Sequence, residues 1–370
     1  MRLHLSPVNV VEIYSHSARA GNAAPFMRLT LEAYRNIVKN VGSRADIATL
    51  CRVSKGFRHV AERALYNTLF LRNDEMSTAL VHTLANSSSL AAYVDALTIF
   101  LSEDVDDSDS EDEEQELTER DTGDVADTYW LSVRGALDQT IALRYLNIHI
   151  GNGFSTSVAW ILRDCTFQLR RFHCDVDWDS DLITFLISQK LLEDLYILDY
   201  RDDSNLLIST TQPNTEASTP SLMPPSTSLP SLPCLTTLEC TFSEAAIALV
   251  PKRPITHLKT CFSRNELDSK RDEMYDLLAK LELSTCPLQS IDLADSNYTE
   301  RFSSELLVAI VNTRRLMSDL RYLGTLVLPV HGGEVCGFFA FLSRSDLLCF
   351  LAPRVLWSTK ALSQNSMHRI

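Results

Sequence analysis

One six-residue pattern, apolar-x-x-apolar-x-apolar, recurs along most of this 370-residue chain. Its last three positions alternate between apolar and variable residues, which indicates a short β-strand with one buried face. The first, middle and last apolar residues of its copies are Val94, Leu97 and Ile99; Leu143, Leu146 and Ile148; Leu169, Phe172 and Cys174; Leu192, Leu195 and Ile197; Leu235, Leu238 and Cys240; Ile255, Leu258 and Thr260; Leu288, Ile291 and Leu293; Leu323, Leu326 and Leu328. The chain is therefore expected to form a series of similar strands.

Apolar residues at helical spacing lie before and between several of these strands. The segments are 76–84, 158–163, 182–189, 245–250, 274–283 and 306–317. Alternation of strands and helices predicts an α/β domain with parallel strands and helices on the outside.

The spacing of the strands indicates a repeat architecture. The middle apolar residues lie 26, 23 and 20 residues apart at three steps, and 33 and 35 apart at two others. The unit of a leucine-rich repeat is about 20–29 residues. Residues 73–330 are therefore predicted to form an irregular leucine-rich-repeat-like solenoid. The alternative is an ordinary α/β domain in which the six-residue copies are simply buried strands.

Two biased segments interrupt the repeats. Residues 103–127 are dominated by Asp and Glu, and such a run of like charges is expected to be disordered. Residues 209–233 are rich in Ser, Thr and Pro and are expected to form a mobile loop. Residues 1–26 are interpreted as a flexible lead-in, and residues 331–370 as a terminal cap or, alternatively, a tail.

Residues 29–71 carry three consecutive helical patterns. The first ends at Gly42, which is expected to adopt a left-handed cap conformation. Asp46 is the expected N-cap of the second helix, and the third spans residues 54–65. A segment this short buries little apolar surface internally, so part of that surface is expected to contact another molecule or domain.

The same stretch, within residues 27–72, resembles an F-box, and its wording is similar to F-box proteins expanded in mushroom-forming fungi. The matching residues are Leu29, Leu31, Glu32 and Ile37 in the first part of the family pattern; Asp46, Ile47, Leu50, Val53, Ser54, Lys55 and Phe57 in the second; and Ala61, Leu65 and Tyr66 in the third. One position departs from the pattern, because the usual proline after the first leucine is Thr30.

The resemblance implies a substrate-recognition subunit of an SCF-type ubiquitin ligase, located in the cytoplasm, the nucleus or both. It would bind a Skp-type adaptor and, through that adaptor, a cullin, while the repeats hold a target protein. The residues implied in adaptor binding are Leu29, Leu31, Glu32, Ile37, Leu50, Val53 and Phe57. The alternative is a leucine-rich-repeat scaffold outside any ligase, in which the N-terminal helices only cap the repeats; Thr30 is the residue that supports it.

The net charge and the cysteine pattern argue against a nucleic-acid-binding protein and against a zinc-binding protein. The formal net charge of −14 argues against nucleic-acid binding, which needs clustered Lys and Arg. Nine cysteines are scattered without a Cys-x-x-Cys pair, which is typical of reduced thiols and not of a zinc site. No stretch of about 18 uninterrupted apolar residues occurs, so no membrane span is expected.

Candidate catalytic and cofactor motifs are incomplete. Asp175, Asp177, Asp179 and Asp181 alternate as in a calcium loop, but the required Gly and Glu are missing, so Asp179 or Ser180 is expected only to cap a helix. Gly151-Asn152-Gly153 lacks the remaining residues of a phosphate-binding fingerprint. No enzymatic activity, metal or cofactor is therefore predicted.

Two serines in the acidic segment are candidate phosphorylation sites. Ser108 and Ser110 each precede a glutamate by three residues, which resembles the acid-directed pattern read by casein kinase II. Added phosphate would make a negative segment more negative and is expected to extend it.

Overall fold

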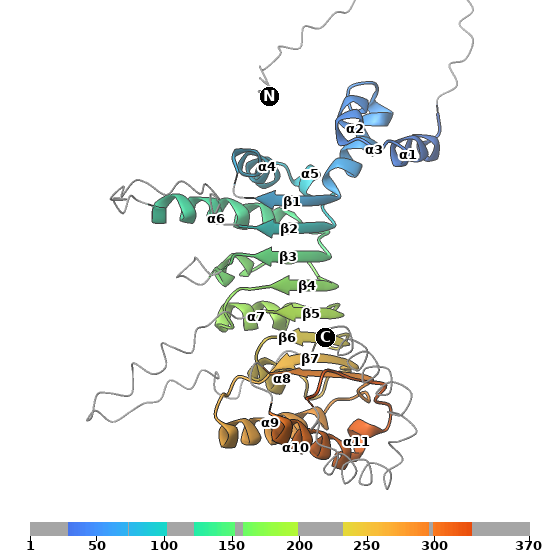
Figure 1. Cartoon of the computed structure of the whole chain (residues 1–370). Helices are drawn as coiled ribbons and strands as arrows, with labels where there is room; N and C mark the ends of the chain where they lie inside the picture. Colours follow the sequence, from blue (N-terminus) through green and yellow to red (C-terminus); the bar gives the residue numbers. More distant parts are fainter. Residues whose placement is uncertain are drawn as a thin grey trace, which may run out of the picture. The chain divides into compact units, whose positions relative to one another are not determined.

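The computed structural model describes residues 29–72, 74–101, 122–151, 158–198, 232–295 and 299–327. Contacts within the chain divide it after Glu62 into two compact units. The first contains the predicted helical stretch, and the second contains the strands (Figure 1).

The N-terminal unit is built from α1 (Leu31–Lys39), α2 (Arg44–Leu50) and most of α3 (Lys55–Tyr66). Val38, Val60 and Ala61 form its buried core. Gly56 brings α3 close to α1, since a β-carbon at this position would lie 2.6 Å from the ring of Tyr34. The three predicted helices are thus present, packed on a small core.

Three details of this stretch differ from the sequence predictions. Asn40 is the C-cap of α1, with φ −93° and ψ 0°, and Gly42 does not take a left-handed conformation. Ser43 and not Asp46 is the N-cap of α2, because its hydroxyl accepts the Asp46 N–H at 3.4 Å. Residues 68–72 of the predicted helical domain form a strand, β1 (Thr68–Arg72).

The second unit contains, in its described part, a nine-stranded sheet in which every neighbouring pair is parallel. Spatial order follows sequence order from β1 to β9. The strands after β1 are β2 (Ala96–Phe100), β3 (Tyr145–His149), β4 (Arg171–Cys174), β5 (Asp194–Ile197), β6 (Thr237–Cys240), β7 (His257–Cys261), β8 (Ser290–Ala294) and β9 (Tyr322–Leu323).

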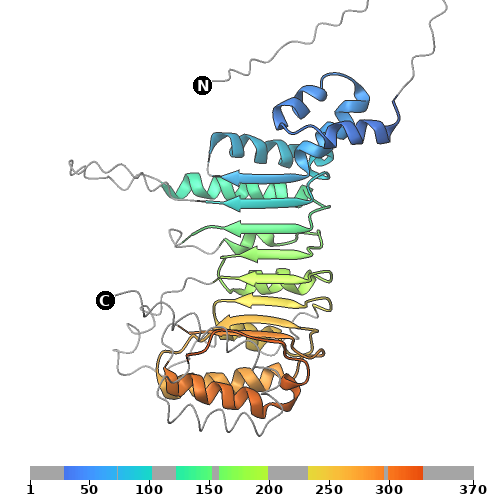
Figure 2. The same cartoon turned by 45° about the vertical axis from the view of Figure 1, so that its right-hand side comes forward.

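Helices connect most of these strands and lie on one face of the sheet (Figure 2). They are α4 (Glu75–Asn86), α5 (Ser88–Ala91), α6 (Thr122–Gln139), the 3-10 helix η1 (Ala159–Leu162), α7 (Ser180–Ser188), α8 (Ser243–Leu249), α9 (Leu267–Leu281), α10 (Glu300–Asn312) and α11 (Arg314–Met317). Asp179, one of the two residues predicted from the sequence to cap this helix, is the N-cap of α7. Its Oδ1 accepts hydrogen bonds from the N–H groups of Asp181 and Leu182, each at 2.9 Å. The α/β class and the parallel sheet predicted from the strand–helix alternation are confirmed.

The middle apolar residues of the repeated pattern align in one row across the sheet. The row is Leu69, Leu97, Leu146, Phe172, Leu195, Leu238, Leu258, Ile291 and Leu323, each paired in register with the next. All but Leu323 are buried, as are nearly all apolar residues two positions later. Because side chains alternate along a strand, the helix-covered face is apolar. The opposite face, called the open face below, carries no helix among the described residues.

The strand predictions need two corrections. The sequence pattern places the last copy around Leu326, whereas Leu323 is the residue aligned with Ile291. The strand β1, with the same pattern at Tyr66, Leu69 and Leu71, was missed because its start was read as the end of a helix.

The segments expected to be disordered are mostly outside the described residues. Residues 122–127 are an exception, since they begin α6 although they were assigned to the disordered acidic segment 103–127. Residues 232 and 233 are the described end of the predicted loop 209–233, and Leu232 is buried. The predictions for residues 1–26 and 331–370 concern parts of the chain outside the described ranges.

Candidate interaction surfaces

Among the described residues of the N-terminal unit, four large aliphatic side chains are exposed to solvent. Leu29 is 48%, Leu31 45%, Ile37 40% and Val53 62% exposed. They come from the start of the unit, from α1 and from the turn between α2 and α3. These four residues, called the exposed aliphatic group below, leave apolar surface uncovered in a unit with a small core, as is typical of a docking surface.

The other residues implied in adaptor binding have different surroundings. Leu50 and Phe57 are partly buried against Val38, Val60 and Ala61, and the Phe57 ring meets Tyr34 edge-on with centroids 4.7 Å apart. Leu50 and Phe57 therefore help to hold the unit together. Glu32 is exposed, and its Oε2 atom lies 3.8 Å from Arg35 Nη1. Ser108 and Ser110 lie outside the described residues.

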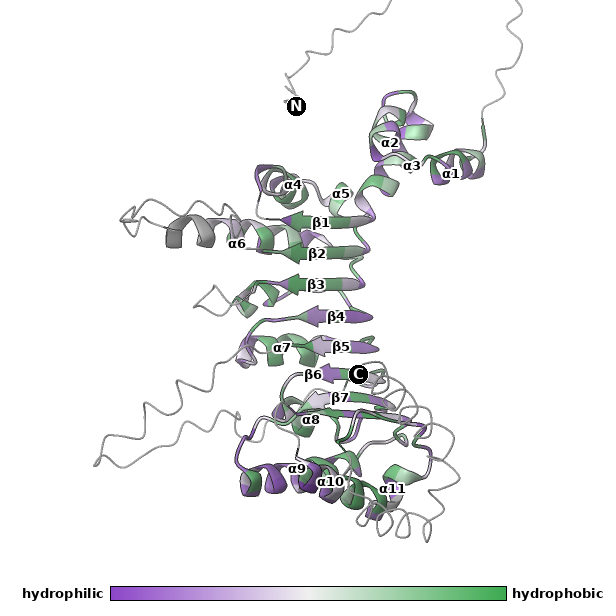
Figure 3. Cartoon of the chain, in the orientation of Figure 1, coloured by the Kyte–Doolittle hydropathy of each residue, from purple (hydrophilic) through white to green (hydrophobic). Residues whose placement is uncertain are grey.

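The second candidate surface is the open face of the sheet. On β1–β3 it presents the side chains of Thr68, Phe70 and Arg72; Ala96, Thr98 and Phe100; and Tyr145, Asn147 and His149. None of these nine side chains is acidic. Figure 3 shows the change along the sheet, with β1–β3 coloured mostly hydrophobic and β4 and β6 mostly hydrophilic.

Three rings on β1–β3 form a continuous row. Phe70 and Phe100 stack with centroids 6.4 Å apart and planes at 24°, and Phe100 meets His149 at 6.1 Å and 69°. The Arg72 guanidinium lies 5.2 Å from the centre of the Phe70 ring, within cation–π distance. Phe70 is 52% and Phe100 39% exposed. Phe70, Phe100 and His149 are called the ring row below.

Charged side chains on the next strands are paired with one another. Arg171 Nε lies 2.8 Å and His173 Nε2 3.8 Å from Asp194 Oδ2. His173 and then Arg171 lower the pKa of Asp194 below its usual value, against a smaller opposing effect of burial. Lys259 pairs with Glu239 farther along the face. The paired charges make this half of the open face more polar and self-neutralising than β1–β3.

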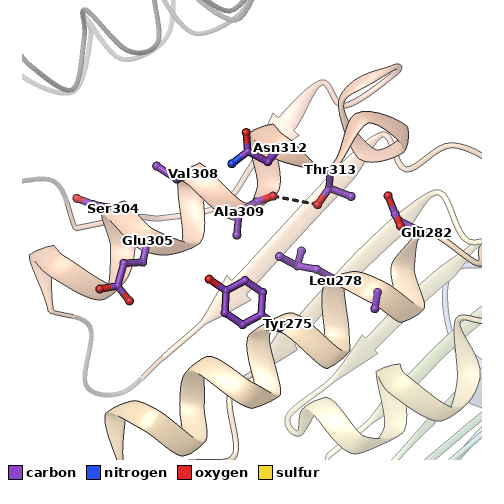
Figure 4. A pocket seen from close by; sticks show the side chains of 10 residues that line it. Tyr275, Leu278, Glu282, Ser304, Glu305, Val308, Ala309, Asn312 and Thr313 are labelled. Atoms are coloured by element: carbon purple, nitrogen blue, oxygen red, sulfur yellow. Dashed lines mark hydrogen bonds between the residues drawn. The ribbon is translucent and has the colours of Figure 1, made fainter.

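A shallow groove of about 560 Å³ runs between α9 and α10 on the helical side (Figure 4). Leu278, Val308 and Ala309 contribute its apolar lining, and Tyr275 and Glu282 stand at its side. No histidine, cysteine or lysine is among its lining residues. The groove offers mainly apolar contact, and the hydroxyls of Ser304 and Thr313 in its lining donate to the backbone carbonyls of Glu300 and Ala309.

A buried polar network joins α9 to the loops that follow β6, β7 and β8. Glu273 accepts hydrogen bonds from the Ser263 and Arg264 N–H groups at 2.7 and 3.0 Å, and from the Ser243 hydroxyl. Lys270 Nζ lies 2.8 Å from both carboxylate oxygens of Asp295. Both partners of this ion pair are almost fully buried. The network holds loops in place and has no exposed reactive group.

Metal and thiol chemistry find little support in the described residues. No cluster of His, Cys, Asp and Glu within the described ranges has the arrangement of a metal site. Burial raises the pKa of the Cys165 and Cys240 thiols to about 12, so they carry little thiolate at neutral pH. Within the same ranges, every helix is too short or too polar to cross a bilayer.

Comparison with known proteins gives no family for this chain. No protein-family model matches the sequence. A search of curated proteins also finds no match.

The structure brings together one group that the sequence did not reveal. Phe70 and Phe100 are variable positions of the repeated pattern and lie 30 residues apart in the chain. They meet only because β1 and β2 pair in parallel register. The signal available in the sequence was the aromatic or basic character of outward positions in the first strands, which becomes informative only when the register is known.

Proposed function

We propose that this protein is a substrate-recognition subunit of an SCF-type ubiquitin ligase. Its N-terminal unit binds a Skp-type adaptor, which links it to a cullin, and its leucine-rich-repeat-like sheet unit binds the target protein. The observation that carries the proposal is the exposed aliphatic group on a small helical unit whose spacing resembles an F-box. The protein itself performs no chemistry and presents one protein to another.

The magnitude of apolar burial is consistent with docking. Full burial of an aliphatic side chain contributes about 1.5–3 kcal/mol. Leu29, Leu31, Ile37 and Val53 are each about half exposed, so covering each would add roughly 1 kcal/mol. Leu50 and Phe57 contribute indirectly, by keeping α1–α3 packed.

The conformation of Thr30 supports the resemblance at the position where the sequence departs from it. Thr30 has φ −68° and ψ 157°, values that a proline adopts readily. Its hydroxyl also accepts the Ala33 N–H at 3.2 Å and caps α1. Threonine therefore keeps the backbone shape that proline would give and adds a helix cap.

The test uses exposed positions, so that binding and folding are separated. Val53→Asp and Ile37→Asp in the full chain should weaken binding to a purified Skp-type adaptor by about tenfold or more, because each places a charge in an apolar contact. Met76→Asp on α4, where Met76 is 83% exposed, is the matched control and should leave binding unchanged. Adaptor binding that is equal in Val53→Asp, Met76→Asp and the unmodified chain would refute the proposal.

A scaffold outside any ligase is the second candidate. The supporting observation is that Tyr66, the last residue of α3, packs against the sheet core, as a residue of a capping helix would. Thr30→Pro distinguishes the two: if the ligase proposal holds, adaptor affinity should rise because the proline ring adds apolar contact in the adaptor groove, whereas it should change little for a scaffold. The lost cap should cost about 1 kcal/mol of unfolding free energy in both cases.

A further inference from the structure

Arg72 on the open face forms no salt bridge with any described residue, although, after the hydrogen bonds from Ser77, its charge makes a small contribution to the lowered pKa of Asp74. Arg171 and Lys259 each pair with a carboxylate of a neighbouring strand. Arg72 instead lies over the Phe70 ring, and β1–β3 bring no Asp or Glu to this face. In a chain of net charge −14, this half of the face is an exception that favours an acidic group on a partner.

The spacing of the ring row fits an extended peptide. The centroids of neighbouring rings are 6.4 and 6.1 Å apart, with one ring on each of β1, β2 and β3. Side chains i and i+2 of an extended chain point the same way and are separated by about 6.5 Å. A peptide that crosses β1–β3 can therefore place alternate side chains against successive rings.

The exposed rings and Arg72 are also the residue types that contribute most at protein interfaces. Aromatic residues and arginine are enriched among the few side chains that dominate binding energy. A single cation argues against a nucleic-acid strand, which needs several cations along its phosphates. The chemistry of the row therefore points to a peptide.

We propose that the ring row binds an extended peptide segment of the target protein. The segment carries aromatic or aliphatic side chains at alternate positions and an Asp or Glu at the end that lies over β1, where its carboxylate meets Arg72. This inference rests on the proposed function, because it describes the protein that would be delivered to the ligase.

Selection from a random-peptide display library on the full chain tests the chemistry without knowledge of the target. A parallel selection on Phe100→Ser removes peptides that bind elsewhere. The peptides specific to the unmodified chain should be enriched in alternating apolar residues followed by Asp or Glu. Enrichment of basic peptides, or no difference between the two selections, would overturn the inference.

Fluorescence anisotropy with the most enriched peptide then locates the site. Phe100→Ser and Arg72→Glu should each weaken binding about tenfold or more. Tyr322→Ser, on the same face at β9, and the surface change Lys190→Glu are the matched controls and should bind as the unmodified chain does. Thermal melting of every variant shows whether it is folded. Arg72→Lys keeps the positive charge, so it should retain part of the peptide affinity if the charge of Arg72 contributes to binding.

Two further measurements distinguish a failure of the proposed peptide site from a failure of the proposed ligase function. A labelled oligouridine strand should not bind, and its binding through Phe100 in place of peptides would refute the inference. Val53→Asp should lose the adaptor and keep the peptide, whereas Phe100→Ser should lose the peptide and keep the adaptor. If the adaptor does not bind but the peptide does, the proposed ligase function fails while the peptide site stands.

Discussion

The buried ion pair between Lys270 and Asp295 gives a quantitative test of the second unit. The Lys270 side chain is 3% exposed and that of Asp295 1% exposed. Lys270 Nζ lies 2.8 Å from both carboxylate oxygens and 5.4 Å from the centre of the Phe302 ring. Replacing Lys270 by Met fills similar space but leaves a buried carboxylate without its counter-charge.

The expected cost is large because that carboxylate was already removed from water. Breaking a buried pair by removing one partner costs about 3–5 kcal/mol, a substantial fraction of a stability of about 5–15 kcal/mol. The exposed pair of Lys259 and Glu239, with side chains 53% and 37% exposed, is the matched control. Lys259→Met should cost no more than about 1 kcal/mol.

Equilibrium unfolding in urea, followed by circular dichroism, measures both differences. The double variant Lys270→Met with Asp295→Leu should recover much of the loss, since it removes the buried carboxylate as well as the lysine. The reasoning would be refuted if Lys270→Met cost less than about 1 kcal/mol, or as little as Lys259→Met.

Three further outcomes follow from the described contacts. Asp194→Asn should lower the free energy of unfolding at pH 7, as measured by urea unfolding. Because the pKa of Asp194 is lowered in the folded state, the stability difference between the two proteins should be fully present above about pH 4. It should vanish as the pH falls through the lowered pKa of the folded state. Phe172→Ala, at a fully buried position of the middle row, should cost about 3–5 kcal/mol by the same assay, and a cost below 1 kcal/mol would contradict the assigned row. Iodoacetamide labelling mapped by mass spectrometry should modify exposed Cys234 at least about a hundredfold faster than the buried thiols, and equal rates in folded protein would contradict their burial; those thiols are Cys165, Cys174 and Cys240.

The strands of the sheet were predictable because their burial leaves a periodic signal. Seven copies of the repeated pattern, from Val94 to Leu293, coincide with β2–β8. The last copy was misplaced because Leu320, Leu323 and Leu326 are equally spaced and allow two registers. Only pairing with β8, through the Gly324 N–H and the Ile291 carbonyl at 2.9 Å, selects Leu323.

The ends of helices are also predicted incompletely from the sequence. Ser43 and Asp46 are both good N-cap residues three positions apart, and local preference alone does not choose between them. The helix α6 is absent from the helical segments expected from the sequence because its first turns follow the acidic run, although Trp130, Val133 and Leu137 repeat at helical spacing and are buried. In each case contacts made after folding decide between alternatives that the sequence leaves open.

The two candidate surfaces differ in how visible they are from sequence. The exposed aliphatic group was named from a resemblance, but Leu50 and Phe57 could be assigned to the internal core only from the packing of α1–α3. The ring row depends on register between distant strands, so no local pattern marks it.

The central claim is that the N-terminal unit binds a Skp-type adaptor, and isothermal titration of the full chain with a purified Skp-type adaptor tests it most directly. The account predicts a one-to-one complex with Kd of about 1 μM or tighter, and a marked loss of affinity in Val53→Asp at unchanged melting temperature. Absence of binding at about 100 μM adaptor, with a chain that melts cooperatively, would contradict it.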